Sequence, residues 1–235
     1  MTPRGSAPAQ CGAGPRCVFA SSVRSLITLY GYPGSASLAP HILLEEAGAE
    51  HTLVRPIRDG PNAGPAEFLA ASPHRRVPAM VDGDVIMTEA AAICMHIADR
   101  HPDALLGPPS DDPERGAWYR WLVYLSNTAQ PALYQYIYPE RYVASGDHAE
   151  AAKQAADAKL GRIWDWIDTE LTDREFLIGD RFSAADAYLW MLGRWSRHQA
   201  HPAFARPHIR ISWDRTLARP SLLRVIEQEE LAWVP

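Results

Sequence analysis

One stretch near the start of the chain, 26–42, limits most strongly what this sequence can fold into. It reads LITLYGYPGSASLAPHI. A short run of strand-forming residues, Leu26 to Tyr30, is stopped by a turn cluster of Gly31, Pro33 and Gly34. The stretch therefore predicts a short buried strand that ends in a tight turn.

A helix is expected directly after this turn. Ser35 and Ser37 stand where a helix would begin, and apolar residues then recur at helical spacing from Leu38 until Gly48. The free N–H groups of a first helical turn and the positive end of the helix dipole both favour negative charge. A strand, a glycine-rich turn and a helix that starts with hydroxyls can hold an anion or a thiolate.

The pattern continues through the first half of the chain as β-α-β-α-β-β-α. An Asp-Gly-Asp turn at 82–84, between apolar residues on both sides, is a strong hairpin signal. This order predicts a small mixed sheet with helices on its faces. The expected elements after the first helix are a strand at 52–57, a short helix around 68–69, strands at 79–81 and 85–87, and a helix from 88 to 101.

The second half of the chain is predicted to be entirely helical. A proline-rich linker at 106–112 separates it from the α/β domain, 26–105. The all-α domain then covers 113–235, with helices expected at 114–133, 149–171, 183–195 and 217–231. The first residues, 1–25, are rich in Gly, Pro, Ala, Ser and Arg, and we expect a flexible extension without a function.

Composition excludes several classes of partner. The 23 Lys and Arg residues are balanced by 28 Asp and Glu, without a basic run, so nucleic acid and anionic membranes are poor partners. No apolar stretch approaches a membrane span. Three cysteines without a C-x-x-C pair favour a reducing compartment, here the cytoplasm. No His or Cys cluster shows ligand spacing, so no metal site is predicted.

The helix expected at 183–195 begins with a capping box. Ser183 and Asp186 stand three residues apart before an apolar run, so the Ser hydroxyl can accept from the third amide and the Asp carboxylate can accept from the Ser amide. Asp186 therefore needs no catalytic role to explain its presence.

Four motifs together resemble a known family. PGSASLAPHI, RVPAMVDG, MTEAAAI and FSAADAYL occur in this order and spacing, and they resemble the cytosolic glutathione transferases, most closely the bacterial beta-class group. The resemblance implies a thioredoxin-like N-terminal domain that binds glutathione and a helical C-terminal domain that lines a second-substrate pocket. It also implies a homodimer, glutathione and a small hydrophobic electrophile as substrates, and no other cofactor.

The implied reaction needs an ionised glutathione thiol. A free thiol has a pKa of about 8.5, and lowering it by two units takes about 2.7 kcal/mol. A hydroxyl at a helix start supplies both a hydrogen bond and a helix dipole. Ala36 stands where the beta class has a cysteine, so a neighbouring hydroxyl or backbone amides must stabilise the thiolate. We expect Ser37 first, then Ser35, with Tyr32 third. Either serine could instead be a simple helix cap.

The resemblance also implies which residues hold the tripeptide. The family keeps a cis proline at the Val77–Pro78 position, and the Val77 backbone would pair with the cysteinyl part of glutathione as an added strand does. Glu89 and Ala90 would hold the γ-glutamyl end at a helix start, with Ala90 offering only its N–H. Arg76 would meet the glycyl carboxylate. The alternatives are a solvated arginine and dipole compensation by Glu89.

The second-substrate pocket should be lined mainly by the first C-terminal helix. The candidates are Tyr32, Tyr124, Asn127, Gln130 and Tyr134. Core packing is the alternative for the aromatic ones. Three other functions stay open: a non-catalytic glutathione- or ligand-binding protein, a glutathione-dependent isomerase or dehalogenase, and a thiol–disulfide reductase that would depend on Cys94.

Overall fold

The strand-forming run at 26–30 becomes a central strand of a four-stranded sheet. The computed structural model describes residues 26–56 and 66–232, so the expected extension at 1–25 lies outside the described residues. β1 (Ile27–Tyr30) pairs in parallel with β2 (His51–Val54) and antiparallel with β3 (Ala79–Asp82). β3 continues through Gly83 into β4 (Val85–Thr88), which gives the order β2-β1-β3-β4. The predicted hairpin is confirmed.

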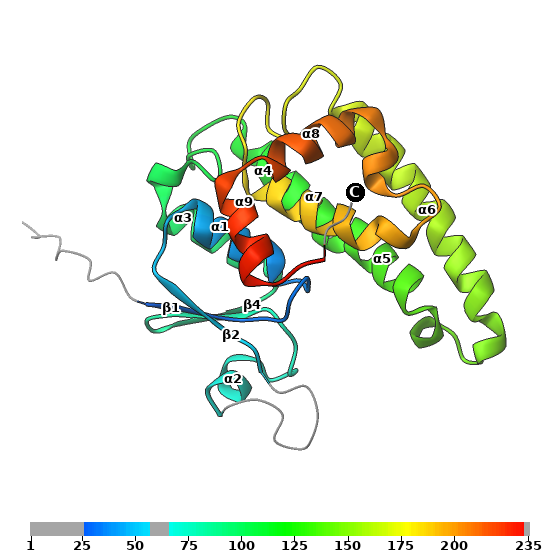
Figure 1. Cartoon of the computed structure of the whole chain (residues 1–235), viewed down its shortest axis with the longest axis horizontal. Coiled ribbons are helices and arrows are strands. Elements are labelled where there is room, and N and C mark those ends of the chain that lie inside the picture. Colours follow the sequence, from blue (N-terminus) through cyan, green and yellow to red (C-terminus); the bar gives the residue numbers. More distant parts are fainter. Residues whose placement is uncertain (1–25, 57–65, 233–235) are drawn as a thin grey trace, which may run out of the picture.

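Helices cover both faces of this sheet (Figure 1). α1 (Leu38–Glu46) and α3 (Ala90–Arg100) lie on the face towards the C-terminal helices, while the short α2 (Ala66–Ala71) lies on the other. The period of two along β1 explains the division, because neighbouring side chains of a strand point to opposite faces. Leu29 joins the large core with α1 and α3, whereas Tyr30 packs with α2 in a small second cluster.

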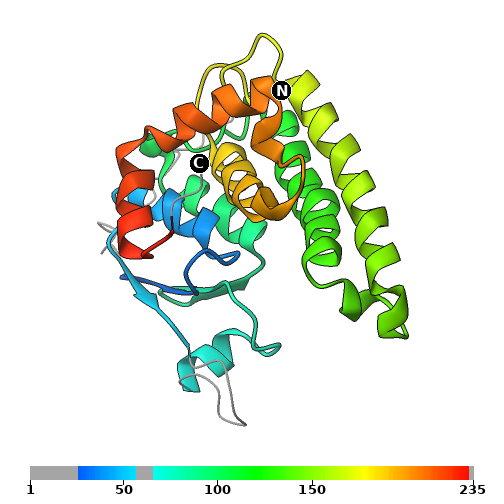
Figure 2. The same cartoon turned by 45° about the vertical axis from the view of Figure 1, so that its right-hand side comes forward.

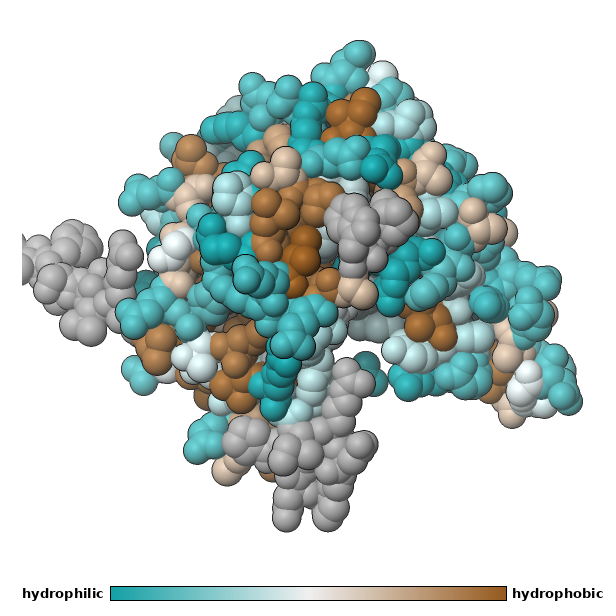
Figure 3. All heavy atoms as spheres, in the orientation of Figure 1, coloured by the Kyte–Doolittle hydropathy of each residue, from teal (hydrophilic) through white to brown (hydrophobic). Residues whose placement is uncertain are grey.

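The second half of the described chain is helical, as predicted. Its α-helices are α4 (Arg115–Tyr124), α5 (Gln130–Ile137), α6 (Ala149–Glu170), α7 (Ala184–Trp195), α8 (Pro207–Leu217) and α9 (Pro220–Gln228). Short 3-10 turns occur at Pro102–Ala104, Pro139–Tyr142, Gly146–His148, Ser196–His198 and Ala203–Ala205. No helix in the described part of the chain is both long and apolar enough to cross a membrane. The face drawn in Figure 3 is mainly hydrophilic, with separate hydrophobic patches.

α7 is the central helix of this half, and every one of its residues is buried. The predicted capping box at its start is confirmed. Asp186 accepts from the Ser183 amide and hydroxyl at 2.8 and 2.9 Å, and from the Leu177 amide at 2.8 Å. Its role is to close the helix start and fix the preceding loop.

Two helix predictions need correction. The expected helix at 114–133 is longer and is interrupted, because a π-helical turn (Leu125–Ala129) separates α4 from α5. The expected helix at 217–231 is shorter: α9 runs from Pro220 to Gln228, and Leu217 is the last residue of α8, a helix that was not predicted. Proline fits the first turn of a helix but not its interior, so Pro220 separates them.

α9 ties the end of the described chain to the N-terminal domain. It lies beside α1 in both views (Figures 1 and 2). Arg219 of the α8–α9 junction pairs with Glu46, and Arg224 of α9 donates to Glu45 at 2.7 Å, with both carboxylates on α1. These contacts hold α1 between the sheet and the C-terminal helices.

Candidate functional site

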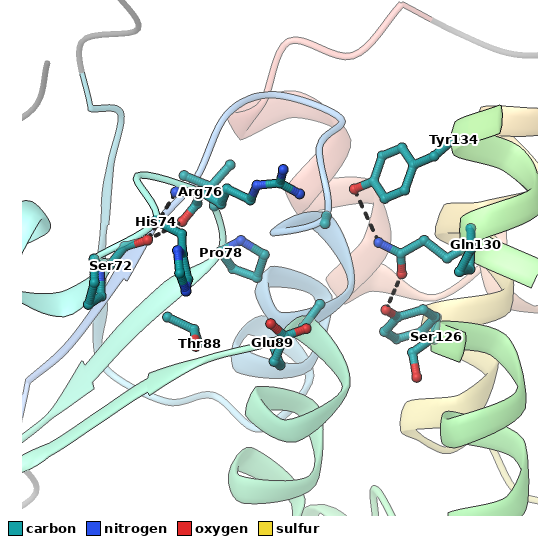
Figure 4. A pocket seen from close by; sticks show the side chains of 15 residues that line it. Ser72, His74, Arg76, Pro78, Thr88, Glu89, Ser126, Gln130 and Tyr134 are labelled. Carbon is teal, nitrogen blue, oxygen red and sulfur yellow. Dashed lines mark hydrogen bonds between the residues drawn. The ribbon is translucent and has the colours of Figure 1, made fainter. Parts of the chain in front are cut away.

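A cavity of about 510 Å³ lies between the two halves of the molecule. Its N-terminal wall comes from the turn before α1, the loop before β3 and the start of α3, and its C-terminal wall from the π turn, α5 and α7 (Figure 4). The lining residues are Ala36, Ser72, Pro73, His74, Arg76, Val77, Pro78, Thr88, Glu89, Ala90, Ser126, Gln130, Pro131, Tyr134 and Tyr188.

The loop before β3 presents free backbone to this cavity. The Val77–Pro78 peptide bond is cis, as the resemblance implied. Within 26–56 and 66–232, no residue hydrogen-bonds to the Val77 N–H or C=O. The Ser72 hydroxyl fixes the loop, since it accepts from the Arg76 amide at 3.0 Å and donates to the Arg76 carbonyl at 2.8 Å. An extended ligand could therefore pair with Val77 as a strand does.

The start of α3 forms a second polar edge of the cavity. Glu89 stands at the N-cap position of this helix with φ at 68°, a positive φ that few residues other than glycine adopt. Ala90, the first helical residue, lines the cavity, and the N–H groups of a first helical turn have no partner within their own helix. Backbone strain of this kind tends to occur at ligand sites. The edge suits a carboxylate with an ammonium beside it.

Arg76 is a free cation at the cavity. Its side chain is exposed and reaches across towards Tyr134 (Figure 4). Among the residues that the structure describes, no carboxylate forms an ion pair with it, although most of the described arginines have such a partner. An anionic group of a ligand would supply one. His74 lines the same side.

Ser37 does not occupy the expected position. The sequence predicted that its hydroxyl would meet the thiolate, but Ser37 is completely buried and is not part of the cavity wall. Its hydroxyl donates to the Tyr32 carbonyl at 3.3 Å and lies 2.9 Å from the Ser35 hydroxyl. It also packs closely on Gly31, where an added Cβ would lie 2.2 Å from the Ser37 oxygen.

The simple capping role is also wrong for Ser37. It stands at the N-cap of α1, but its side chain accepts no capping hydrogen bond there. Ser35 accepts from the amides of Tyr32 and Ser37, both at 3.3 Å, and likewise does not line the cavity. The two serines brace the turn. Ala36, between them, is the residue that reaches the cavity, and no described residue accepts a hydrogen bond from its N–H.

A chain of three polar side chains crosses the C-terminal wall. The Tyr188 hydroxyl of α7 donates to the side-chain oxygen Oε1 of Gln130. The side-chain nitrogen Nε2 of Gln130 in turn donates to the Tyr134 hydroxyl oxygen at 3.2 Å. This direction leaves the Tyr134 proton free to donate into the cavity. Burial raises the pKa of Tyr134 above its ordinary value, so the phenol stays protonated at neutral pH. Sequence reasoning missed Tyr188, because no local pattern connects it to Gln130.

Only two of the five predicted second-substrate residues line the cavity. Gln130 and Tyr134 do, whereas Tyr32, Tyr124 and Asn127 do not. Tyr124 packs edge-on against Trp121 and Trp166, with ring centroids 6.0 and 4.5 Å apart, so the core-packing alternative applies to it. Asn127 is exposed at the π turn. The described wall is therefore less aromatic than the sequence suggested.

Cys94 cannot serve as a redox thiol in this fold. It is completely buried within α3, and burial raises the pKa of its thiol. A thiol that stays protonated and inaccessible does not attack a disulfide. This finding argues against the thiol–disulfide reductase that the sequence left open.

Known proteins resemble both halves of the chain. The family model "Glutathione S-transferase, N-terminal domain" matches residues 25–99, and "Glutathione S-transferase, C-terminal domain" matches residues 150–227. A probable glutathione S-transferase, GSTF2, of Oryza sativa subsp. japonica is 32% identical over 193 residues, which is 78% of this chain and 87% of that protein.

Solved structures agree. A sphingomonad glutathione S-transferase complexed with glutathione is 29% identical, with a TM-score of 0.75 over 87% of this chain and 100% of its own. A bacterial beta-class glutathione S-transferase of Sphingomonas chungbukensis is 31% identical, with a TM-score of 0.74 over the same shares. With the thioredoxin-like sheet, the helical second half and the cavity between them, these matches show that the chain belongs to the glutathione S-transferase family.

Proposed function

We propose that this glutathione transferase conjugates the glutathione thiolate to small hydrophobic electrophiles in the cavity between the α/β domain, 26–105, and the helical domain, 113–235. The observation that supports this function most is a set of polar groups on the N-terminal wall of the cavity that have no hydrogen-bond or ion-pair partner among the described residues. Free backbone at Val77, a helix start at Ala90 and an unpaired Arg76 lie around one cavity. Together they match a peptide that carries two carboxylates and one ammonium.

In this proposal each group holds one part of glutathione. The backbone of Val77, positioned by Pro78, pairs with the cysteinyl residue. The first amides of α3 and the Glu89 carboxylate hold the γ-glutamyl carboxylate and ammonium. Arg76 pairs with the glycyl carboxylate. The sphingomonad relative was solved with glutathione bound, which supports the ligand class.

The thiol donors in the proposal differ from the serines that the sequence favoured, and one of them is a backbone amide, the alternative that the sequence left open. The Ala36 N–H and the Tyr134 hydroxyl take the direct role, while Ser37 and Ser35 hold the turn that carries Ala36. A hydrogen bond to a charged acceptor contributes about 1.5–3 kcal/mol, and the α1 N-terminus about 0.3–1 kcal/mol. Two donors and the dipole together reach the roughly 2.7 kcal/mol that a two-unit shift in pKa requires.

We also propose a relationship to the beta class without its cysteine chemistry. The motifs of the turn and the 31% identity to the Sphingomonas chungbukensis protein support the relationship. Ala36 removes the thiol that would form a mixed disulfide with glutathione. Conjugation, isomerisation and dehalogenation all remain compatible with a site of this kind, since each begins with thiolate attack.

A homodimer in the cytoplasm completes the proposal. Exposed apolar side chains on the edge strand β4 (Val85 and Ile86) and on α4 (Tyr119 and Val123) would be covered by a second copy. The free thiol of Cys94 agrees with a reducing compartment.

The test is a conjugation assay with glutathione and an activated aryl chloride. We expect catalysed conjugation, and a kcat that falls about tenfold or more in Tyr134→Phe, because the free proton of the polar chain is lost. Tyr124→Phe is the matched control, because it removes a phenol that does not line the cavity. Tight glutathione binding without turnover of any electrophile would instead identify a ligand-binding protein.

A further inference from the structure

A cluster outside the glutathione cavity has the composition of a metal site. His41, Glu45 and His51 each place one ligand atom within 4.8 Å of the other two. His41 and Glu45 are four residues apart, so they lie on the same face of α1. His51 is the first residue of β2, which follows α1 after a short turn. No metal site was predicted from the sequence, because His51 joins the H-x-x-x-E pair of α1 only in the folded chain.

The hydrogen bonds of the two histidines involve Nδ1 and leave Nε2 of each ring available to a metal. The His41 Nδ1 lies 2.8 Å from a carboxylate oxygen of Glu229 and the His51 Nδ1 lies 2.8 Å from the Ala49 carbonyl. Both partners only accept hydrogen bonds, so each Nδ1 carries the proton. In the neutral imidazoles the lone pairs are then on the two Nε2 atoms, and the His51 Nε2 lies 3.9 Å from the Glu45 Oε1. Metal-binding histidines are usually oriented in this way.

The Nε2 of His41 supplies an independent observation. The His41 side chain is 1% exposed, and its Nε2 is a buried polar atom without a hydrogen-bond partner among the described residues. Such atoms are rare in folded proteins and call for an explanation. The hydrogen bond to Glu229 explains only the other nitrogen of the ring.

We infer that His41, Glu45 and His51 form a binding site for a divalent transition metal, with Zn²⁺ as the first candidate. Two imidazoles and one carboxylate with an open fourth position are a common zinc ligand set. The Glu45 and His51 side chains are 13% and 11% exposed, so a metal and a water ligand can reach them from solvent. The inference does not depend on the proposed function.

The geometry requires closure of the three ligand atoms, which lie within 4.8 Å of one another. The His51 Nε2 lies 3.9 Å from the Glu45 Oε1, whereas ligand atoms around a tetrahedral zinc are about 3.3 Å apart. The Glu45 Oε1 would exchange its hydrogen bond from Gln228, at 2.8 Å, for the metal. Arg224 holds the other carboxylate oxygen at 2.7 Å and would stay in place. Glu45 and Glu229 together supply two negative charges, which balance the double positive charge of the metal.

Through Glu229, the site would connect the metal to the turn before α1 and to the end of α9. Glu229, which orients His41, also accepts the Gly34 amide at 2.7 Å in the turn before α1. α9, which ends next to Glu229, lies beside α1 in Figures 1 and 2. A metal on His41 would thus strengthen the contact between the N-terminal domain and the end of the helical domain.

The test uses the untagged full chain, freed of metal by a chelator and kept without glutathione, which itself binds zinc. Co²⁺ is titrated and its visible absorption bands are followed, and Zn²⁺ is then added to displace it. We expect a saturable one-to-one spectrum of a four-coordinate site, displaced by Zn²⁺, and a rise in Tm with Zn²⁺.

His51→Ala is the decisive variant, because its side chain is partly exposed and its loss need not disturb folding. It should weaken Co²⁺ binding at least a hundredfold, since loss of outer partners alone costs 10–100-fold. His208→Gln is the matched control: its Nδ1 also pairs with a carboxylate, Asp168 at 3.0 Å, but outside the cluster. Its spectrum should be that of the wild type. No cobalt spectrum in the wild type, or an unchanged one in His51→Ala, would overturn the inference.

Discussion

Gly34 should be among the most sensitive positions near the site. It has φ at 66° in the turn before α1, and an added Cβ would lie 2.6 Å from the Arg194 Nη1 atom. Its N–H donates to Glu229 at 2.7 Å and its C=O accepts from the Trp195 indole at 2.8 Å, so the turn cannot move away. Arg194 is itself buried, at 8% exposure. Gly34→Ala therefore combines backbone strain with overpacking.

Gly48→Ala separates these two costs. Gly48 has φ at 58°, but an added Cβ there would meet nothing within 4 Å. Left-handed backbone costs an L residue about 1–2 kcal/mol in either position, and overpacking adds about 1–3 kcal/mol. Alanine recovers about 0.4–1 kcal/mol through the unfolded chain in both. We expect Gly34→Ala to lower the free energy of unfolding by about 1–3 kcal/mol more than Gly48→Ala does.

The assay is urea unfolding followed by tryptophan fluorescence, at one protein concentration for all variants. Because Gly34 lies two residues before Ala36, Gly34→Ala should also weaken glutathione binding, whereas Gly48→Ala should not. Equal losses of stability in the two variants would refute the reasoning, because the close contact with Arg194 would then carry no cost.

Three further predictions concern single side chains. Arg76→Ala should weaken glutathione binding about tenfold, the value of one charge-assisted hydrogen bond. The control Arg75→Ala changes a neighbouring residue outside the cavity wall and should leave binding unchanged. Titration calorimetry with glutathione measures both affinities. Ser37→Ala should lower the free energy of unfolding, measured by urea unfolding, by about 1–3 kcal/mol through two lost hydrogen bonds. It should have little effect on the pKa of the bound glutathione thiol. A large rise in that pKa would show that the Ser37 hydroxyl does stabilise the thiolate directly. Burial raises the pKa of Asp186 to about 6, against hydrogen bonds from Leu177 and Ser183. Because the folded pKa lies above the unfolded one, this contribution to stability is complete below about pH 4 and is lost as pH rises through 6. The free energy of unfolding, measured between pH 4 and 6.5, should therefore decline in the wild type but not in Asp186→Asn.

The sequence could predict elements whose cause is local. The strand at 26–30, the hairpin at Gly83 and the capping box at Ser183 all follow from residues within a few positions of one another, and the structure has all three. The helix start at Pro220 was equally local and was missed, because the apolar spacing of 217–231 was followed across a proline.

The site was harder to predict because its geometry is not local. Ser37 and Ala36 are neighbours, yet only the turn conformation decides that the alanine reaches the cavity and the serine is buried. Tyr188 orients Gln130 from a different helix. Glu229 reaches His41 from the end of the chain, so a candidate metal ligand set became visible only after folding brought these elements together.

The most direct test of the account is the titration of the glutathione thiol on the protein. Ultraviolet difference absorbance reports the thiolate of bound glutathione as a function of pH. The account predicts a titration one to two units below the value of about 8.5 for a free thiol, moved upwards in Tyr134→Phe and nearly unchanged in Ser37→Ala. A bound thiol that titrates like free glutathione would contradict the claim that this cavity activates it.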